Sequence, residues 1–412
     1  MIYYPSEALP KSAVSQVRAW LSVMLVVAVL LAFRQWRNMD VMGCLVALVV
    51  AVALPHILEQ IPSIFERFKT GNAFSAKRIV LKLLGLVALF SVVLLAFLVF
   101  RGFAREFLQP LKEIPEMWIV MLALVTPFYI AVTDRVMQEP DDALAALGRN
   151  VLGTSAIESN HSLQQFLLGW LVKAFFAPLM IVFATHDLPN VLTQDYMAWL
   201  TKPSGWFEAS YQMLFFIDVV FGATGYLCTF KLFDAHIRSA EPTAFGWMVC
   251  IICYPPFWNT VSNSFLNYGG NPGWGFWLAE WRGLYVVWGL AILTCVAVYL
   301  WATISFGMRF SNLTHRGVLS NGPYRFLKHP AYISKNLSWW LVSVPFFSSE
   351  GGWQSFLNCL ALLMVNGIYF LRAVTEERHM SRDPAYVAYA AWIKDHGILA
   401  KLKRITSRTS TA

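Results

Sequence analysis

The chain has 412 residues, of which 57% are hydrophobic and 14% are charged, and its mean hydropathy is +0.53. This composition excludes an ordinary soluble domain of the same length. The net charge of +8 needs no nucleic-acid partner, because the basic residues cluster between apolar runs, as the positive-inside rule describes for membrane proteins. We therefore expect an all-α, polytopic integral membrane protein.

Several apolar runs are long enough to cross a bilayer, which takes about 20 residues in a helix. We predict about ten transmembrane helices, near residues 15–33, 38–57, 79–100, 116–133, 164–185, 208–230, 243–263, 283–306, 331–348 and 354–374. We divide the chain into an N-terminal transmembrane region over 1–205, with about five helices and no readable role, and a C-terminal region over 206–412. The first four runs are Leu-, Val- and Ala-rich, which is typical of a scaffold or a dimer surface.

The basic residues also predict an orientation. The segments after the second and eighth runs and the C-terminal tail are rich in Lys and Arg, whereas 264–281 contains neither. The positive-inside rule then places both termini in the cytoplasm, as an even number of helices also requires. We expect a cell (inner) membrane protein whose segment after the eighth run faces the cytoplasm.

Two expected helices carry a charge near their middle, Lys173 in the fifth and Asp218 in the sixth. Charged side chains inside a membrane are costly and normally paired. We favour a buried ion pair that joins the two helices, and the alternative is a role in binding the head group of a substrate.

The seventh run contains Pro255 and Pro256, flanked by Tyr254, Trp258 and Asn259. Paired prolines break the hydrogen bonds of a helix, which a membrane tolerates only where protein or a cavity shields the backbone. The pattern indicates a kink that lines a substrate pocket or, equally well, a kink without a ligand.

The segment 321–332, Asn-Gly-Pro-Tyr-Arg-Phe-Leu-Lys-His-Pro-Ala-Tyr, leads into the ninth run. Pro330 suits the first turn of a helix and puts His329 at or beside the N-cap. Lys328 and Arg325 lie just outside the helix, so basic side chains and free backbone N–H groups converge there. This arrangement predicts a site for a carboxylate or a phosphate.

A pair of carboxylates, Glu376 and Glu377, follows at the far end of the next apolar run. Adjacent residues on a helix point about 100° apart, so we expect the two side chains to face different partners. Arg372 precedes Glu376 by one turn and could orient it. Basic groups on one wall and carboxylates on the other suit a zwitterionic ligand.

These motifs resemble those of the isoprenylcysteine carboxyl methyltransferase family, which groups with membrane phospholipid N-methyltransferases. The resemblance covers about 288–397 and rests on Gly-Pro-Tyr-Arg at 322–325, Lys-His-Pro-Ala-Tyr at 328–332, Glu-Glu at 376–377 and Asp-Pro-Ala-Tyr at 383–386. Two positions depart from the family pattern: Lys328 stands where the family has Arg, and Ser334 stands where it has Gly.

The resemblance implies an enzyme that transfers a methyl group from S-adenosylmethionine to a lipid or a lipidated, isoprenoid-like acceptor at the cytoplasmic face of the membrane. The residues expected to bind the cofactor, from the motif and the resemblance together, are Tyr324, Arg325, Lys328, His329, Pro330, Tyr332, Glu376, Glu377 and Tyr386. The candidate catalytic residues are Glu377 and Arg372, and the candidate substrate-binding residues are Lys173, Asp218, Tyr254, Trp258 and Asn259.

Several alternatives stay open from the residues themselves. A carboxylate acceptor needs no base, whereas an amine or a hydroxyl must lose a proton, for which Glu377 or His329 could serve.

A competing enzyme class is the NADPH-dependent, sterol- or isoprenoid-type membrane reductase, but such reductases carry an Asn-Tyr-Leu-Gly-Asp type run where this chain has Ala-Tyr-Ile-Ser-Lys at 331–335. A transporter would need broken helices in both halves, and only the seventh run has one. The eight histidines are scattered, so we expect no metal. The oligomeric state is not readable.

Overall fold

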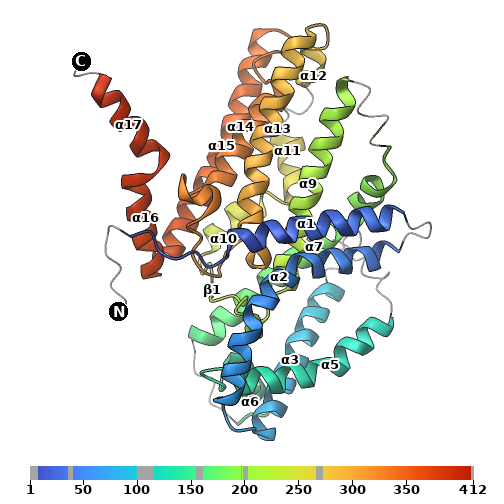
Figure 1. The fold of residues 1–412 in the computed structure, drawn as a ribbon, viewed down its shortest axis with the longest axis vertical. Helices are drawn as coiled ribbons and strands as arrows, with labels where there is room; N and C mark the ends of the chain where they lie inside the picture. Colours follow the sequence, from blue (N-terminus) through green and yellow to red (C-terminus); the bar gives the residue numbers. More distant parts are fainter. Residues whose placement is uncertain are drawn as a thin grey trace.

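The computed structural model describes residues 8–35, 40–99, 116–154, 161–195, 197, 203–265 and 272–409. Within these ranges nearly all regular structure is helical (Figure 1). The α-helices are α1 (Gln16–Arg34), α2 (Val41–Lys69), α3 (Ala76–Val99), α5 (Glu116–Val136), α6 (Ala143–Val151), α7 (His161–Thr193), α9 (Pro203–Leu227), α10 (Ala244–Ile251), α11 (Phe257–Phe265), α12 (Trp274–Trp277), α13 (Arg282–Ile304), α14 (Pro330–Ser343), α15 (Gly352–Met380), α16 (Pro384–His396) and α17 (Ile398–Thr409). The shorter elements are the 3₁₀ helices η2 (Lys231–Phe233), η4 (Gly307–Arg309) and η5 (Gly322–Arg325) and the strands β1 (Ser239–Ala240) and β2 (Thr314–His315).

Seven of the described helices are long and apolar enough to cross a membrane. They lie in α1, α2, α3, α5, α7, α13 and α15. Their exposed side chains are largely apolar, such as Leu122 and Leu124 on α5, which are 66% and 73% exposed. Such surfaces suit contact with lipid, so the expectation of an all-α, multi-pass membrane protein is confirmed.

The expected count of ten is not confirmed, because three of the expected spans differ from a simple membrane helix. The sixth corresponds to α9, which is not among the seven. The seventh is divided into α10 and α11, with Pro255 and Pro256 between them, because proline lacks the N–H that a continuous helix needs. The ninth is α14, whose 14 residues extend about 21 Å, less than the hydrocarbon thickness of about 30 Å.

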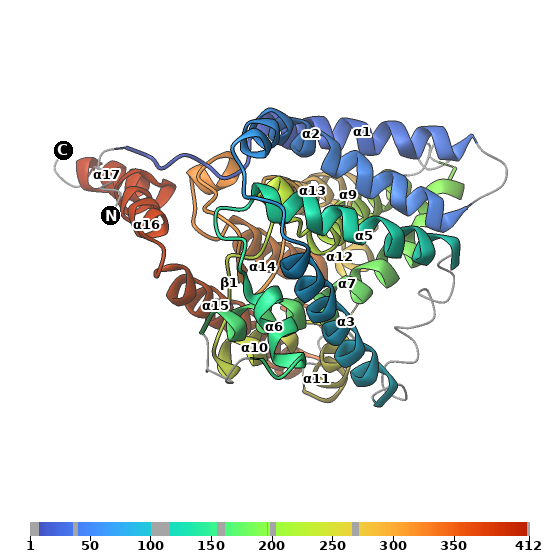
Figure 2. The ribbon, with the colours of Figure 1, turned by 90° about the horizontal axis from the view of Figure 1, so that it is seen from below.

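The described helices do not form one parallel bundle. In Figure 1, α9, α13, α14 and α15 stand upright, while α1 and the start of α2 run across them. Helix α2 then turns downward, and it contains Pro55 and Pro62, which bend a helix by removing hydrogen bonds. Figure 2 shows α1 and α2 along one side of the molecule, with α11 on the opposite side.

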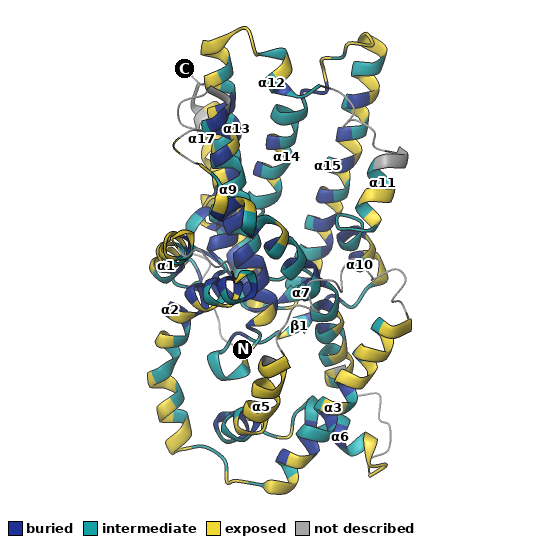
Figure 3. Ribbon diagram, turned by 90° about the vertical axis from the view of Figure 1, so that its right-hand side faces the viewer, coloured by how far each residue is buried: buried dark blue, intermediate teal, exposed yellow. Residues whose placement is uncertain are grey.

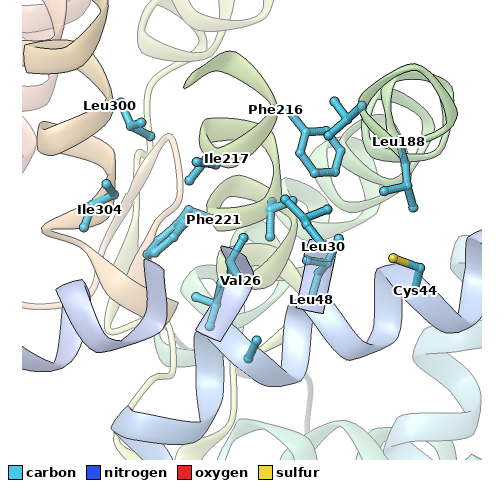
Figure 4. Packing of buried hydrophobic residues seen from close by; sticks show 14 of the residues in the cluster. Val26, Leu30, Cys44, Leu48, Leu188, Phe216, Ile217, Phe221, Leu300 and Ile304 are labelled. Carbon is cyan, nitrogen blue, oxygen red and sulfur yellow. The ribbon is translucent and has the colours of Figure 1, made fainter. Parts of the chain in front are cut away.

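The largest buried cluster lies where the crossing and the upright helices meet. It combines side chains from α1, α2, α7, α9 and α13, among them Val26, Leu48, Leu188, Phe221 and Ile304 (Figure 4). Figure 3 shows the same concentration of buried residues at the middle of the molecule and more exposed helix ends above and below it. Packing at this crossing therefore joins the N-terminal helices to the C-terminal ones.

An ion-pair network joins α3, α5 and the start of α6, although we expected the spans that correspond to α3 and α5 to be plain apolar scaffold. The ammonium of Lys82 lies 2.9 Å from Asp134 and 3.7 Å from Asp142, and Arg78 lies 2.6 Å from Asp134. Lys231 on η2 also binds Asp142 at 2.7 Å. Because both carboxylates are paired with cations, these charges fix the helices relative to one another.

An extended N-terminal segment supports the chain that precedes α14. The backbone N–H of Ala13 donates to Val318 at 2.8 Å, and the amide of Asn321 donates to the carbonyl of Val14 at 2.6 Å. The hydroxyl of Ser320 donates to the carbonyl of Pro10. Residues 10–14, which we call the N-terminal strap, thus hold the chain at 318–321, where the sequence motif begins.

The buried guanidinium of Arg316 ties several loops together. Its N–H groups donate to the carbonyl oxygens of Gly225 at 2.6 Å, Met308 at 2.9 Å, Phe310 at 3.0 Å and Cys228 at 3.2 Å, and also to Ala235. These carbonyls come from the end of α9, from η4 and from the loop before β1. The paired strands β1 and β2, in which Ser239 lies opposite His315, close the same region.

Replacing Arg316 by methionine is expected to lower the free energy of unfolding by at least about 3 kcal/mol, because each buried carbonyl left without a donor costs about 1–3 kcal/mol. Arg316→Lys keeps the charge but has three donors in place of the planar fork, so its loss should be intermediate. The measurement is the unfolding midpoint of the purified protein in detergent. Arg282→Met, at the exposed start of α13, is the control, and equal stability of the two methionine variants would contradict the role given to Arg316.

Candidate functional site

Two adjoining cavities lie where the start of α14 meets the C-terminal end of α15. The main cavity contains about 1000 Å³ of space, including its mouth, and the side cavity about 620 Å³. Both are lined by Phe306, Ser311, Thr314, Tyr324, Lys328, His329, Glu376 and Met380. The two cavities therefore meet at the segment that the sequence motif singles out.

Many of the expected site residues converge on these cavities. Those that line the main cavity are Tyr254, Tyr324, Lys328, His329, Tyr332, Arg372 and Glu376. Tyr386 lines the side cavity. Tyr254 comes from the chain between α10 and α11 and the others lie within 324–386, so the fold brings distant segments together.

The turn before α14 is fixed by its prolines and by α16. Pro330 occupies the first turn of α14 and His329 is its N-cap residue, as expected from the sequence. The hydroxyl of Tyr389 on α16 donates to the carbonyls of Tyr324 at 2.7 Å and Leu327 at 3.3 Å. Burial raises the pKa of Tyr389 above its usual value, so the hydroxyl keeps the proton that it donates.

Glu377 clamps the beginning of α14 to the end of α15. One of its carboxylate oxygens accepts a hydrogen bond from the ammonium of Lys328 at 2.7 Å, and the other lies 2.9 Å from Nε2 of His329. Charge-assisted hydrogen bonds of this kind are stronger than neutral ones. The side chain of Glu377 is 35% exposed and lines neither cavity, although Lys328 and His329 line both.

Glu376 faces a different partner, as the 100° offset between adjacent helical residues predicts. Its carboxylate accepts a hydrogen bond from the hydroxyl of Tyr332 at 2.9 Å. The rings of Tyr332 and His329 stack with a centroid distance of 5.5 Å and an angle of 3°. The two glutamates, the tyrosine and the histidine thus form one continuous polar cluster.

The basic and acidic residues of the motif are in direct contact. The sequence suggested basic groups on one wall and carboxylates on the other, but Lys328 and His329 both contact Glu377. An anionic group that approached the N-terminus of α14 would therefore compete with Glu377 for them. The carboxylate of Glu376, which is 40% exposed, has no such cation at hydrogen-bond distance among the described residues, since Nδ1 of His329 lies 4.0 Å away.

Arg372 lies further into the main cavity, in an aromatic environment. Its guanidinium lies 5.0 Å from the ring centroid of Tyr369, 5.1 Å from that of Tyr332 and 5.8 Å from that of Tyr254. It also donates a hydrogen bond to the side-chain carbonyl of Asn312 at 3.0 Å. The sequence suggested that Arg372 orients Glu376. In the structure Arg372 contacts ring faces and an amide instead.

Lys335 is a second cation in the main cavity, one that the sequence reasoning did not propose. Its ammonium lies 5.2 Å from the ring centroid of Tyr299, 5.5 Å from that of Trp339 and 5.7 Å from that of Tyr369. The hydroxyl of Tyr299 donates to Asp218 at 2.7 Å. The sequence did contain a signal for this residue, because Lys335 is a charged side chain within the apolar run expected at 331–348.

A further polar group lies beside the main cavity, where β1 meets α15. Nε2 of His379 lies 2.9 Å from the hydroxyl of Ser239, and Nδ1 lies 3.9 Å from Glu241. His379 and Glu241 both line the cavity. The sequence reasoning did not identify this cluster, because its members are about 140 residues apart.

The expected ion pair between Lys173 and Asp218 is not present among the described residues. The ammonium of Lys173 lies 3.2 Å from the ring centroid of Trp170, whereas Asp218 accepts from Tyr299. Helices α7 and α9 do pack together, but Lys173 and Asp218 contact other residues and not each other. Neither Lys173 nor Asp218 lines either cavity, and Asp218 contacts Tyr299 and Thr303, which line the main one.

The remaining expected residues lie at different places around the site. Trp258 on α11 stacks on Trp339, with a centroid distance of 6.4 Å, beside the main cavity. Asn259 and Arg325 are exposed. Pro330 is buried and shapes the helix start without lining a cavity.

We compared the chain with protein-family models, with curated proteins and with solved structures, and none of the three comparisons found a match.

Proposed function

We propose that this protein is an S-adenosylmethionine-dependent methyltransferase of the membrane, acting on a lipid or lipidated acceptor. The observation that carries the proposal is the convergence of His329, Tyr332, Glu376 and Arg372 around one cavity at the junction of α14 and α15. These are positions of the motif that resembles the methyltransferase family.

The residues present fit the chemical groups of this cofactor. Carboxylates accept hydrogen bonds from an ammonium or from ribose hydroxyls, and Glu376 offers one at the mouth of the cavity. Aromatic faces attract a sulfonium cation, and Tyr332 and Tyr324 supply them. When bound, S-adenosylmethionine supplies an activated methyl group.

The chain itself has to hold the acceptor in line and exclude water. The clamp of Glu377 on Lys328 and His329 fixes the start of α14 and so the position of Tyr332. Tyr332 in turn orients the carboxylate of Glu376. Glu377 is therefore best described as a positioning residue, because its carboxylate is engaged by Lys328 and His329 and not by the cavity.

We further propose that the cavity mouth and both termini face the cytoplasm of an inner membrane. The basic residues that flank the apolar helices support this orientation. In this topology α9, the broken pair α10–α11 and the short α14 add to the seven long helices, which gives about ten membrane elements.

Binding of S-adenosylhomocysteine to the purified protein tests the proposed activity. We expect saturable binding by calorimetry and a dissociation constant raised at least about tenfold, or 1.4 kcal/mol, in Glu376→Gln. Tyr332→Phe should weaken binding less, because it removes only the hydroxyl that orients Glu376. Glu350→Gln, on an exposed loop, is the matched control and should bind normally.

The same titration with NADPH distinguishes the competing enzyme class. Binding of NADPH without binding of S-adenosylhomocysteine would reject the methyltransferase and favour a sterol- or isoprenoid-type reductase.

The orientation is tested separately with reporter fusions at the C-terminus in a bacterial host. A fused green fluorescent protein should fluoresce and a fused alkaline phosphatase should be inactive, because the first folds in the cytoplasm and the second needs the oxidising periplasm. The opposite pair of results would place the C-terminus outside.

A further inference from the structure

The last described helix, α17, carries apolar and basic side chains on different faces. At about 100° per residue, Ile398, Leu402 and Leu399 lie at about 0°, 40° and 100° around the helix. Lys401 and Lys403 lie at about 300° and 140°, so they border the apolar face on both sides. Basic residues beside an apolar face are typical of amphipathic helices that lie in a membrane interface.

The apolar face of α17 is largely exposed in the described part of the chain. The side chains of Ile398, Leu399 and Leu402 are 42%, 65% and 52% exposed. Figures 1 and 2 show α16 and α17 at one edge of the molecule, apart from the upright helices. Helix α17 has 12 residues, about 18 Å in length, which is too short to cross a bilayer. Its exposed apolar side chains therefore do not belong to a membrane span.

The charge of this end of the chain is strongly positive. Residues 397–412 contain four Lys or Arg residues and no Asp or Glu. Lys401 and Lys403 are exposed, and neither forms a salt bridge with a carboxylate of the described residues. The nearest acidic residue in the sequence is Asp395 on α16, and the adjacent Lys394 offsets its charge. The charge of α17 therefore favours an anionic partner.

The start of α17 is fixed close to the place where α15 ends. The backbone N–H of Ile398 donates to the carbonyl of Phe326 at 3.0 Å, and the hydroxyl of Tyr389 on α16 donates to the carbonyl of Tyr324 at 2.7 Å. These contacts attach α16 and α17 to the segment before α14, which Glu377 binds to the end of α15. Because α15 is long and apolar enough to cross a membrane, the membrane surface at its end lies within reach of α17. Such tethering raises the effective concentration of the surface.

We propose that α17 binds the surface of an anionic phospholipid membrane, the same membrane that the chain spans. The apolar side chains enter the region of the head groups, and Lys401 and Lys403 contact lipid phosphates at the borders of the apolar face. Anionic lipids attract basic segments that lie close to the surface, and salt screens this attraction. The inference is independent of the proposed methyltransferase activity, because it needs neither the cofactor nor the acceptor.

Hydrogen–deuterium exchange of the full-length protein in nanodiscs tests this binding. An isolated helix of about 12 residues is marginal in water, so the amides of α17 should exchange fast unless its apolar face is covered. We expect peptides over 398–409 to exchange at least about tenfold more slowly in nanodiscs with phosphatidylglycerol than in nanodiscs of phosphatidylcholine alone. The difference should shrink in about 1 M NaCl, where the Debye length is about 3 Å.

Two double variants separate the contributions of charge and of apolar contact. Lys401→Gln with Lys403→Gln should remove the difference between the two lipids, because the head groups then attract no lysine at the borders of the apolar face. Leu399→Ser with Leu402→Ser should leave α17 exchanging fast in both lipids. The exchange of peptides from α13 is the internal reference that shows each variant to be folded.

The matched control is Lys69→Gln with Lys77→Gln, which makes the same change of charge at exposed positions of α2 and α3 and should behave like the wild type. Equally slow exchange of α17 in both lipids would show that its apolar face is covered without recognition of charge, and would overturn the proposal. Fast exchange in both lipids would reject the membrane surface as the partner and favour an acidic protein. A lipid difference that persists in Lys401→Gln with Lys403→Gln would exclude these two lysines. Failure to bind S-adenosylhomocysteine would reject the methyltransferase and leave this result unchanged.

Discussion

The buried guanidinium of Arg316 is the contact on which the geometry of the site depends. It binds carbonyls at the end of α9, in η4 and in the loop before β1, so it fixes the loop between α13 and β2. That loop carries Asn312, which holds Arg372 and also binds the hydroxyls of Tyr226 and Tyr254. Among the described residues this buried cation has no carboxylate partner and donates to backbone carbonyls instead, and so it sets the position of one wall of the main cavity.

The site combines charged and aromatic side chains around one cavity. Glu377 binds Lys328 and His329, whereas Glu376 lines the cavity and binds Tyr332. Lys335 and Arg372 line the same cavity and lie among aromatic rings.

The N-terminal helices contribute to the site by contact, although they lie outside the motif. The strap at residues 10–14 binds the chain at 318–321, directly before η5 and α14. Helices α1 and α2 pack against α7, α9 and α13 in the largest buried cluster. The pairing of Lys82 with Asp134 makes α3 and α5 more than apolar scaffold, because a buried charge needs a specific partner and so fixes the relative position of the helices.

The sequence by itself determined the features that depend on local composition and spacing. Long apolar runs predicted a multi-pass helical membrane protein, and the position of Pro330 predicted the start of α14 with His329 as its N-cap. The offset between Glu376 and Glu377 predicted two different partners, because helical geometry is fixed over a few residues.

Only the tertiary structure decided which distant side chains meet. The sequence reasoning paired Lys173 with Asp218, yet Trp170 and Tyr299 are their partners, because the depth and rotation of a membrane helix are set by packing and not by its own sequence. For the same reason Lys335 was not expected at the cavity. Its contacts depend on rings from α13 and α15 that approach it only in the folded chain.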